Sequence, residues 1–166
     1  MGNRIGWPVL ALAVMAPGAG TAQDTAGARE PAFWLQAGLG VSTENLGGLV
    51  AASVAKGQHL LSARASFVAD NLDGGDDEAF DVAILYGRPL RSTGVFRPSA
   101  AAGIGYIRCE GCDNGLNAAG VGLALSVEAA LWPAGFAGIG IHGFANANSI
   151  ASFAGVALTI QAGRRR

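Results

Sequence analysis

The only two cysteines of the chain, Cys109 and Cys112, are separated by a glutamate and a glycine. Two cysteines this close usually form a disulfide in an oxidising compartment. A redox role would need an activated thiolate, normally at the start of a helix, and a metal site would need two further ligands nearby. The neighbouring residues indicate neither. We therefore predict a Cys109–Cys112 disulfide, with no metal and no cofactor.

Four residues with chemically active side chains stand inside otherwise apolar segments: Arg64, Asp81, Glu128 and His142. Charges inside a protein need partners, because an isolated charge is costly to remove from water. If the four share one face of the fold, they form either a structural polar cluster or the lining of a gate or small-molecule site. Their arrangement depends on the elements that carry them.

A group of acidic residues surrounds Gly74 and Gly75 and predicts a polar loop. The group consists of Asp70, Asp73, Asp76, Asp77 and Glu78. Its spacing matches no defined calcium-binding loop, and a solvated loop accounts for it. The alternatives are binding of divalent cations near anionic lipid, or a surface for a partner.

Charge and composition exclude one class of function. Charged residues make up 14% of the 166 residues and hydrophobic residues 51%, whereas an average soluble domain has about 25% charged residues. The 11 basic and 12 acidic residues nearly cancel, so the chain has no positive field to hold a nucleic-acid backbone. Nucleic acid is therefore not an expected partner.

Residues 1–22 have the three-part layout of a secretory signal peptide. Arg4 supplies a positive charge, residues 7–15 are apolar, and residues 17–22 are small. The apolar part is too short for a helix across a bilayer, which needs about 20 residues. We expect the mature chain to begin near Gln23, with a short polar periplasmic segment at 23–32.

From Phe33 onward, apolar side chains recur at every second position, which is the period of a strand. In residues 121–131 the odd positions are all apolar, whereas the even positions are small or polar. Helices are disfavoured because each glycine, as in 135–143, costs a helix about 1 kcal/mol relative to alanine. The pattern predicts eight strands, at 33–42, 48–55, 60–69, 79–87, 99–108, 119–131, 136–146 and 153–162.

The connections between these strands alternate in length. Compact turns with glycine or proline follow the second, fourth and sixth strands, whereas longer acidic segments follow the third and fifth. Most strands have about the nine to eleven residues that a tilted strand needs to cross a bilayer. In these features the whole mature chain resembles the small eight-stranded outer-membrane barrels of the OmpA and OmpX type. It departs from them in ending with Arg164, Arg165 and Arg166 rather than with an aromatic residue.

The resemblance implies an all-β fold, an eight-stranded antiparallel up-and-down transmembrane β-barrel over 33–163, followed by a basic tail at 164–166. Such a protein would be a monomer in the outer membrane and would contact outer-membrane lipid. Aromatic residues near the predicted strand ends would form a thin girdle at the membrane surfaces. They are Trp34, Trp132, Tyr86, Tyr106, Phe80 and Phe96.

If the apolar row faces lipid, then Arg64, Asp81, Glu128 and His142 all face the lumen. An eight-stranded barrel is just wide enough for its own side chains, which favours a structural polar plug over a gate or a small-molecule site. Counting residues from the strand ends places Arg64 and Glu128 at similar heights. We therefore expect an ion pair between these two, with Asp81 as the rival acceptor.

The leading functional hypothesis is a non-catalytic barrel with a structural or surface-interaction role. A lipid-modifying enzyme centred on His142 is the first alternative, because some small outer-membrane barrels are lipid A deacylases. That family has a serine two residues after the histidine, where this chain has Phe144, so we expect no hydroxyl for His142 to activate. The second alternative is a secreted soluble barrel whose apolar row faces inward, around an apolar ligand.

Overall fold

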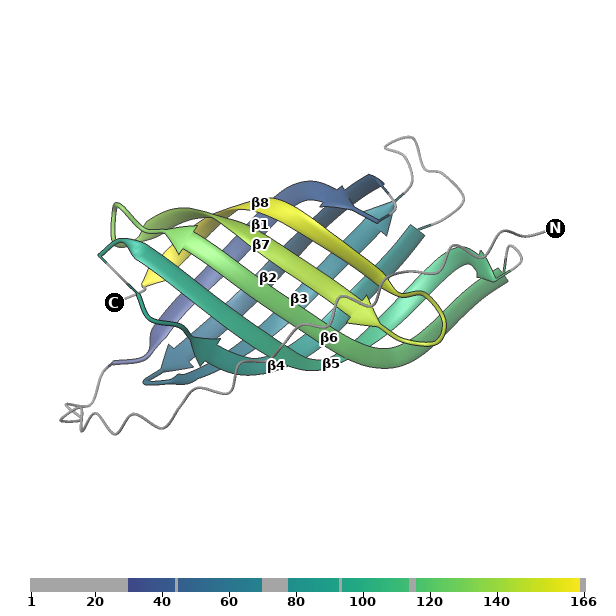
Figure 1. Cartoon of the computed structure of the whole chain (residues 1–166), viewed down its shortest axis with the longest axis horizontal. Coiled ribbons are helices and arrows are strands. Elements are labelled where there is room, and N and C mark those ends of the chain that lie inside the picture. The colour runs from purple at the N-terminus through teal and green to yellow at the C-terminus, as the bar shows by residue number, and fades with distance from the viewer. Residues whose placement is uncertain (1–29, 44, 70–77, 93, 114–115, 165–166) are drawn as a thin grey trace.

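The computed structural model describes residues 30–43, 45–69, 78–92, 94–113 and 116–164. These residues form a single sheet of eight strands that closes on itself (Figure 1). The strands are β1 (Ala32–Ser42), β2 (Asn45–Lys56), β3 (His59–Ala69), β4 (Glu78–Pro89), β5 (Phe96–Asp113), β6 (Leu116–Leu131), β7 (Ala137–Ala147) and β8 (Phe153–Arg164).

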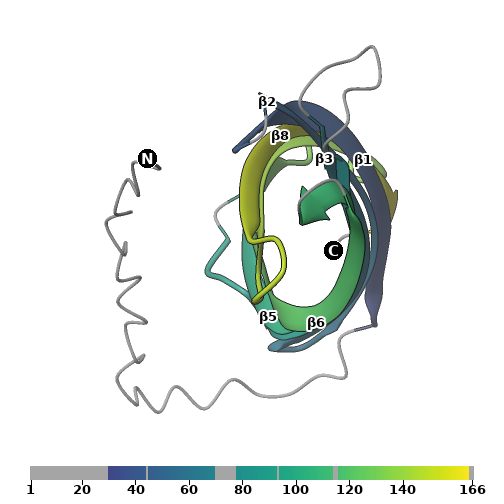
Figure 2. The same cartoon turned by 90° about the vertical axis from the view of Figure 1, so that its right-hand side faces the viewer.

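Every strand pairs antiparallel with the next one in the chain, and β8 pairs with β1, with Phe33 opposite Arg164. An end-on view shows the resulting ring of strands (Figure 2). The predicted fold class, an eight-stranded antiparallel up-and-down barrel, is therefore confirmed. Closure leaves no sheet edge with unpaired backbone groups, which is a requirement for strands that cross a bilayer.

The side chains alternate between the two faces of the wall as the sequence pattern predicts. Large apolar residues of the predicted lipid-facing row lie on the outside, for example Ile104, Leu158 and Ile160, which are 68 to 70% exposed. Polar residues of the opposite row lie inside, and Arg64 and Asp81 are at most 1% exposed. An apolar outer surface of this kind needs lipid rather than water around it.

The two ends of the barrel differ in their connections. We call the end where β1 begins and β8 stops the terminus end, and the opposite end the loop end. The three hairpin turns at the terminus end each contain a glycine with positive φ, namely Gly57 (62°), Gly94 (57°) and Gly135 (71°). Glycine adopts this backbone conformation without the steric cost that a side chain would add, so these positions fix the turns.

The hairpin of β5 and β6 is longer than predicted. Most of the segment 109–118, expected to be an outer loop, belongs to the two strands, with an irregular register between Cys109 and Asp113. Figure 1 shows this hairpin projecting beyond the neighbouring strands at the loop end. A run with glycine, acidic residues and two cysteines suggests a loop, but two strands that pair with each other satisfy their backbone groups beyond the rest of the barrel.

Several predicted segments lie outside the described residues. These are the signal peptide 1–22, most of the segment 23–32, the acidic residues Asp70, Asp73, Asp76 and Asp77, and Arg165 and Arg166. Glu78 is the first residue of β4, and Arg164 is the last residue of β8. Among the residues that the structure does describe, no helix is long and apolar enough to span a membrane.

A charge placed on the outer face tests which side of the wall contacts lipid. Leu158→Arg, near the middle of β8, is expected to lower the free energy of unfolding by about 2 to 4 kcal/mol in phospholipid vesicles. Ala134→Arg, in the exposed turn between β6 and β7, serves as the control and should change it by less than about 0.5 kcal/mol. Guanidinium titration monitored by tryptophan fluorescence measures both. An equal, small effect of the two substitutions would mean that the outer face is not in lipid.

Candidate functional site

The lumen is filled in layers, with an apolar cluster toward each end. The cluster at the terminus end consists of Trp34, Ala55, Leu60, Ala130 and Trp132. The cluster that extends toward the loop end consists of Leu49, Ala51, Val68, Ala79, Ile107, Cys109, Phe144, Phe153 and Ala157. Strand β3 shows the order plainly, since its inward residues run from Leu60 through Ser62, Arg64 and Ser66 to Val68. Polar side chains therefore occupy most of the middle of the lumen, between these two clusters and beside a small third one of Ala83, Leu85 and Ala124.

Two of the aromatic residues predicted for the girdle belong to this filling instead. Trp34 and Trp132 are 0% and 4% exposed and face inward, so the prediction that they lie at the outer membrane surface is wrong. Position within the strand suggested the girdle, but the side of the wall is set by the alternation, which places Trp34 on the inward row. The exposed aromatic residues Phe80, Phe96, Tyr86 and Tyr106 remain on the outer face.

Arg64 is the centre of the polar layer. Its Nη2 lies 2.9 Å from Oδ2 of Asp81, and its Nη1 donates to the carbonyl oxygen of Leu125 at 2.6 Å and to Ser126 Oγ at 3.2 Å. The guanidinium also lies 5.8 Å from the ring centre of Phe144, within the range of a cation–π contact. A single side chain of β3 thus binds groups on β4, β6 and β7.

The expected ion pair between Arg64 and Glu128 is wrong in its acceptor, because the structure pairs Arg64 with the rival, Asp81. Counting heights from the strand ends compared strands across the lumen, whose relative position depends on tilt and stagger. The register of adjacent strands is the stronger constraint. Ser66 pairs directly with Asp81, which makes Arg64 the diagonal neighbour of Asp81 on the same face, within reach of a long side chain.

Asp81 is held by three donors from three directions. Besides Arg64, Ser66 Oγ donates to Oδ1, and Asn146 Nδ2 donates to Oδ2 at 3.1 Å. Asn146 reaches Asp81 because Gly105 leaves space: a Cβ at Gly105 would lie 2.6 Å from Asn146 Nδ2 and 3.1 Å from Asp81 Oδ2. The absent side chain at this position is therefore a requirement of the cluster.

A chain of hydrogen bonds runs from the terminus-end cluster to the middle of the lumen. The indole nitrogen of Trp132 donates to Gln161 Oε1 at 3.0 Å, and Gln161 Nε2 donates to Gln36 Oε1 at 3.1 Å. Gln36 Nε2 then lies 3.0 Å from His142 Nδ1, and His142 Nε2 lies 2.8 Å from Ser126 Oγ. An indole nitrogen can only donate, so it fixes the orientation of both amides in turn.

The direction of these hydrogen bonds, from Trp132 through the two glutamines, fixes the tautomer of His142. Since Gln36 donates to Nδ1, that nitrogen carries no proton in the neutral ring, and Nε2 is the nitrogen that donates to Ser126 Oγ. Ser126 Oγ also accepts from Arg64, which again can only donate. His142 is thus oriented to give Ser126 a hydrogen bond rather than to remove its proton.

The presence of Ser126 corrects one sequence-based expectation. Phe144 stands two residues after His142, where the lipid A deacylases have a serine. For that reason we expected no hydroxyl within reach of the histidine. The hydroxyl comes instead from the neighbouring strand β6, at 2.8 Å. Spacing along one strand could not reveal it, because cross-strand neighbours depend on register.

Glu128 lies beside this chain and is 4% exposed. It pairs with Ser99 of β5 on one side and with His142 of β7 on the other. The cavity next to it is lined by Gln36, Ser53, Leu60, Ser62, Ser99, Ala101, Ser126, Glu128 and His142, and it has room for about one water molecule. No small-molecule site of useful size is present in this part of the described lumen.

The four residues predicted for the lumen cluster, Arg64, Asp81, Glu128 and His142, are all buried inside the barrel. Of the groups that connect them, Gln36 and Gln161 stand on the inward row of the sequence pattern and are buried in the structure. Sequence reasoning missed Asn146. It also missed Arg97, an inward residue of β5 that donates to Ser92 Oγ at 3.2 Å. Each stands on the inward row, so the alternation could have indicated them once the strand bounds were known.

Cys109 is disulfide-bonded, and Cys112 is the only other cysteine in the sequence. Cys109 is fully buried in the larger apolar cluster, so this bond begins in the lumen filling rather than in an outer loop. No group of three or more histidine, cysteine, aspartate or glutamate residues that could hold a metal ion occurs within the described ranges.

The eight-stranded antiparallel barrel structurally matches solved outer-membrane proteins. The chain is similar to Neisserial surface protein A, with 8% identity, 82% of this chain and 99% of that chain covered, and a TM-score of 0.58. It is also similar to the outer-membrane enzyme PagL, with 14% identity, 78% and 98% coverage, and a TM-score of 0.50. No family model matches the sequence, and no curated protein matches it. At these identities the likeness is one of fold.

Removing either member of the central ion pair should destabilise the barrel. Arg64→Ala and Asp81→Ala are each expected to cost about 3 to 5 kcal/mol, because each leaves a buried charge without its counter-ion. The double variant should lose less than the sum, since the two losses share one interaction. A double-mutant cycle of unfolding free energies in detergent measures the coupling between Arg64 and Asp81. The same cycle for Arg64 and Glu128 serves as the comparison. Additive losses for Arg64 and Asp81 would contradict the assigned pairing.

The disulfide predicts the absence of free thiols in the isolated protein. Alkylation of the unfolded chain without reductant should add no mass, whereas alkylation after reduction should add two labels. Intact-mass measurement distinguishes the two. Two labels before reduction would reject the Cys109–Cys112 bond.

Proposed function

We propose that this chain is a non-catalytic outer-membrane barrel with a structural or surface-interaction role and a closed, side-chain-filled lumen. The observation that carries the proposal is the filling itself: apolar clusters at both ends and a hydrogen-bonded polar layer between them. The apolar outer row supports a position in lipid, and the two similar structures support an outer-membrane position by analogy of fold. The surface-interaction part rests on the acidic residues 70–78 of the sequence, as a site for a partner or divalent cations, and we propose a monomer.

The arrangement of His142 supports a structural role for the polar layer. A general base for a serine must accept the hydroxyl proton, whereas the donors that surround His142 leave its Nε2 as a donor to Ser126. Both side chains are also less than 10% exposed and face the lumen, where the adjacent cavity holds about one water molecule. A lipid substrate has no room beside them.

A lipid-modifying enzyme remains the second candidate, and one contact favours it. The distance of 2.8 Å between His142 Nε2 and Ser126 Oγ is that of a nucleophile and its base. One of the two similar structures is an outer-membrane enzyme. Catalysis at this pair would need the amide chain to reverse its direction and the lumen to open.

Two measurements on the same purified protein distinguish the candidates. In planar bilayers we expect no steady conductance, because the lumen is filled. Incubation with lipid A followed by mass spectrometry should show no acyl chain released, with a known deacylase as the positive control, and Ser126→Ala should give the same result as the unsubstituted protein. Stepwise conductance would indicate a pore. Acyl release that Ser126→Ala abolishes would establish the enzyme instead.

A further inference from the structure

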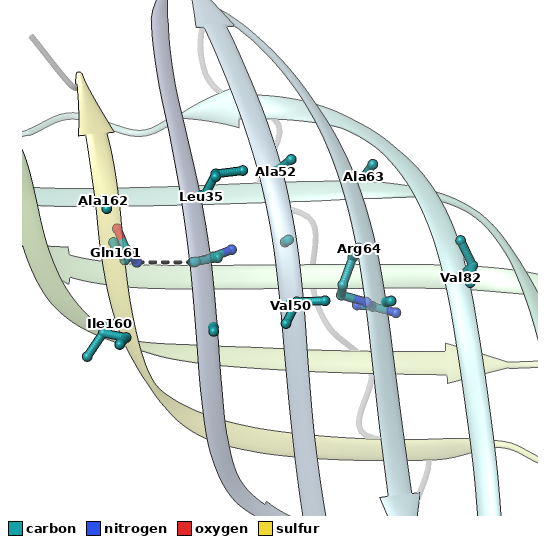
Figure 3. Close-up of a pocket in the computed structure, with 13 residues that line it drawn as sticks. Leu35, Val50, Ala52, Ala63, Arg64, Val82, Ile160, Gln161 and Ala162 are labelled. Carbon is teal, nitrogen blue, oxygen red and sulfur yellow. Dashed lines mark hydrogen bonds between the residues drawn. The ribbon is translucent and has the colours of Figure 1, made fainter.

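The outer wall contains a groove that the lumen does not account for. It has a volume of about 640 Å³ and crosses strands β8, β1, β2, β3 and β4. Small residues of the outward row, such as Ala52 and Ala63, lie in it, and larger ones such as Val50, Val82 and Ile160 border it (Figure 3). Intervening residues of the inward row also line it, so the strands themselves form its floor. The groove is apolar and open to the surroundings of the barrel.

A basic patch lies on the same strands at the terminus end. It consists of Lys56 of β2, His59 of β3, and Tyr86 and Arg88 of β4, all exposed on the outside of the wall. Lys56 pairs with His59 across the hairpin, and His59 Nδ1 lies 2.6 Å from the Tyr86 hydroxyl. The patch is therefore one continuous surface over three adjacent strands.

The patch contains the cationic side chains Lys56 and Arg88 and no acidic residue. Arg91, three residues after Arg88 along the chain, is another exposed cation. Glu30, which precedes β1, has its carboxylate 2.9 Å from Arg164 at the end of β8. Cationic and tyrosine side chains at the edge of an apolar band are the groups that contact lipid headgroups.

The distance between the groove and the basic patch suits a lipid whose acyl chain lies in the groove and whose headgroup lies at the patch. Ala52 precedes Lys56 by four residues on β2, and Ala63 follows His59 by four on β3. At a rise of about 3.3 Å per residue, the groove lies about 13 Å from the patch along each strand. An acyl chain in the groove would thus extend from a headgroup at the patch. Water in the groove would gain no hydrogen bonds from an apolar lining.

We propose that this face of the barrel is a binding site for an anionic phospholipid. The phosphate lies against Lys56, Arg88 and the Tyr86 hydroxyl, and one acyl chain fills the groove over Ala52 and Ala63. Charge complementarity selects the anionic headgroup, and the groove distinguishes a lipid from a free phosphate ion. The proposal rests on the membrane location proposed above, and it adds a specific lipid to it.

Lipid selectivity in nanodiscs and native mass spectrometry test the site. The unsubstituted barrel should retain phosphatidylglycerol in preference to phosphatidylcholine. Each cation beside an anionic headgroup contributes about fivefold in affinity, so Lys56→Gln and Arg88→Gln should each reduce retention of phosphatidylglycerol by about that factor. Arg108→Gln, an exposed cation near the loop end of β5, is the matched charge control and should leave retention unchanged.

The groove is tested separately from the charge. Ala52→Leu with Ala63→Leu should fill it and reduce retention of both lipids, whereas Ala129→Leu, on the outward face of β6, should not. Millimolar inorganic phosphate should not displace the lipid.

Equal retention of the two lipids, or equal effects of the site and control variants, would overturn the proposal. Displacement by phosphate without any effect of the groove variants would assign the patch to a free anion and also overturn it. Failure of the protein to insert into any bilayer would overturn the membrane location together with the site.

Discussion

The buried guanidinium of Arg64 is the interaction on which the interior of this barrel depends. Removing a cation from water is costly unless its charge and its donors are matched. The lumen matches the charge and the two terminal nitrogens with Asp81 on β4, carbonyl oxygens on β6 and β7, and the ring of Phe144, and it leaves only Nε of this side chain without a hydrogen-bond partner among the described residues. The residues around it follow from this need, since Ser66 and Asn146 hold Asp81, and Gly105 leaves space for Asn146.

Hydrogen-bond direction connects this cluster to the end of the barrel. Trp132 and Arg64 can act only as donors, and they stand at opposite ends of the chain of groups that passes through the two glutamines, His142 and Ser126. With a donor at each end, the groups between them have little freedom of orientation. A serine and a histidine at hydrogen-bonding distance can therefore form part of a structural network, and the distance alone does not identify a catalytic pair.

The fold was accessible from the sequence because the strand period places every second side chain on the same face. That single rule predicted the eight strands, the outward apolar row and the inward position of Arg64, Asp81, Glu128 and His142. It failed where strand neighbours had to be known: the acceptor of Arg64, the hydroxyl near His142 and the length of the β5–β6 hairpin all depend on register. Trp34 shows a different failure, since nearness to a strand end outweighed the alternation that places it inside.

The wall itself relates the lumen to the outer groove. Arg64 faces inward from β3, while its neighbours Ala63 and Ala65 face outward and line the groove. Only one layer of backbone therefore separates a buried ion pair from the surroundings, and the backbone groups in that layer are engaged in the sheet. Water in the groove would place a high dielectric close to the ion pair, whereas an acyl chain would keep both sides of the layer dry. The small residues that open the groove and the charged residue behind it thus favour the same occupant, an apolar chain.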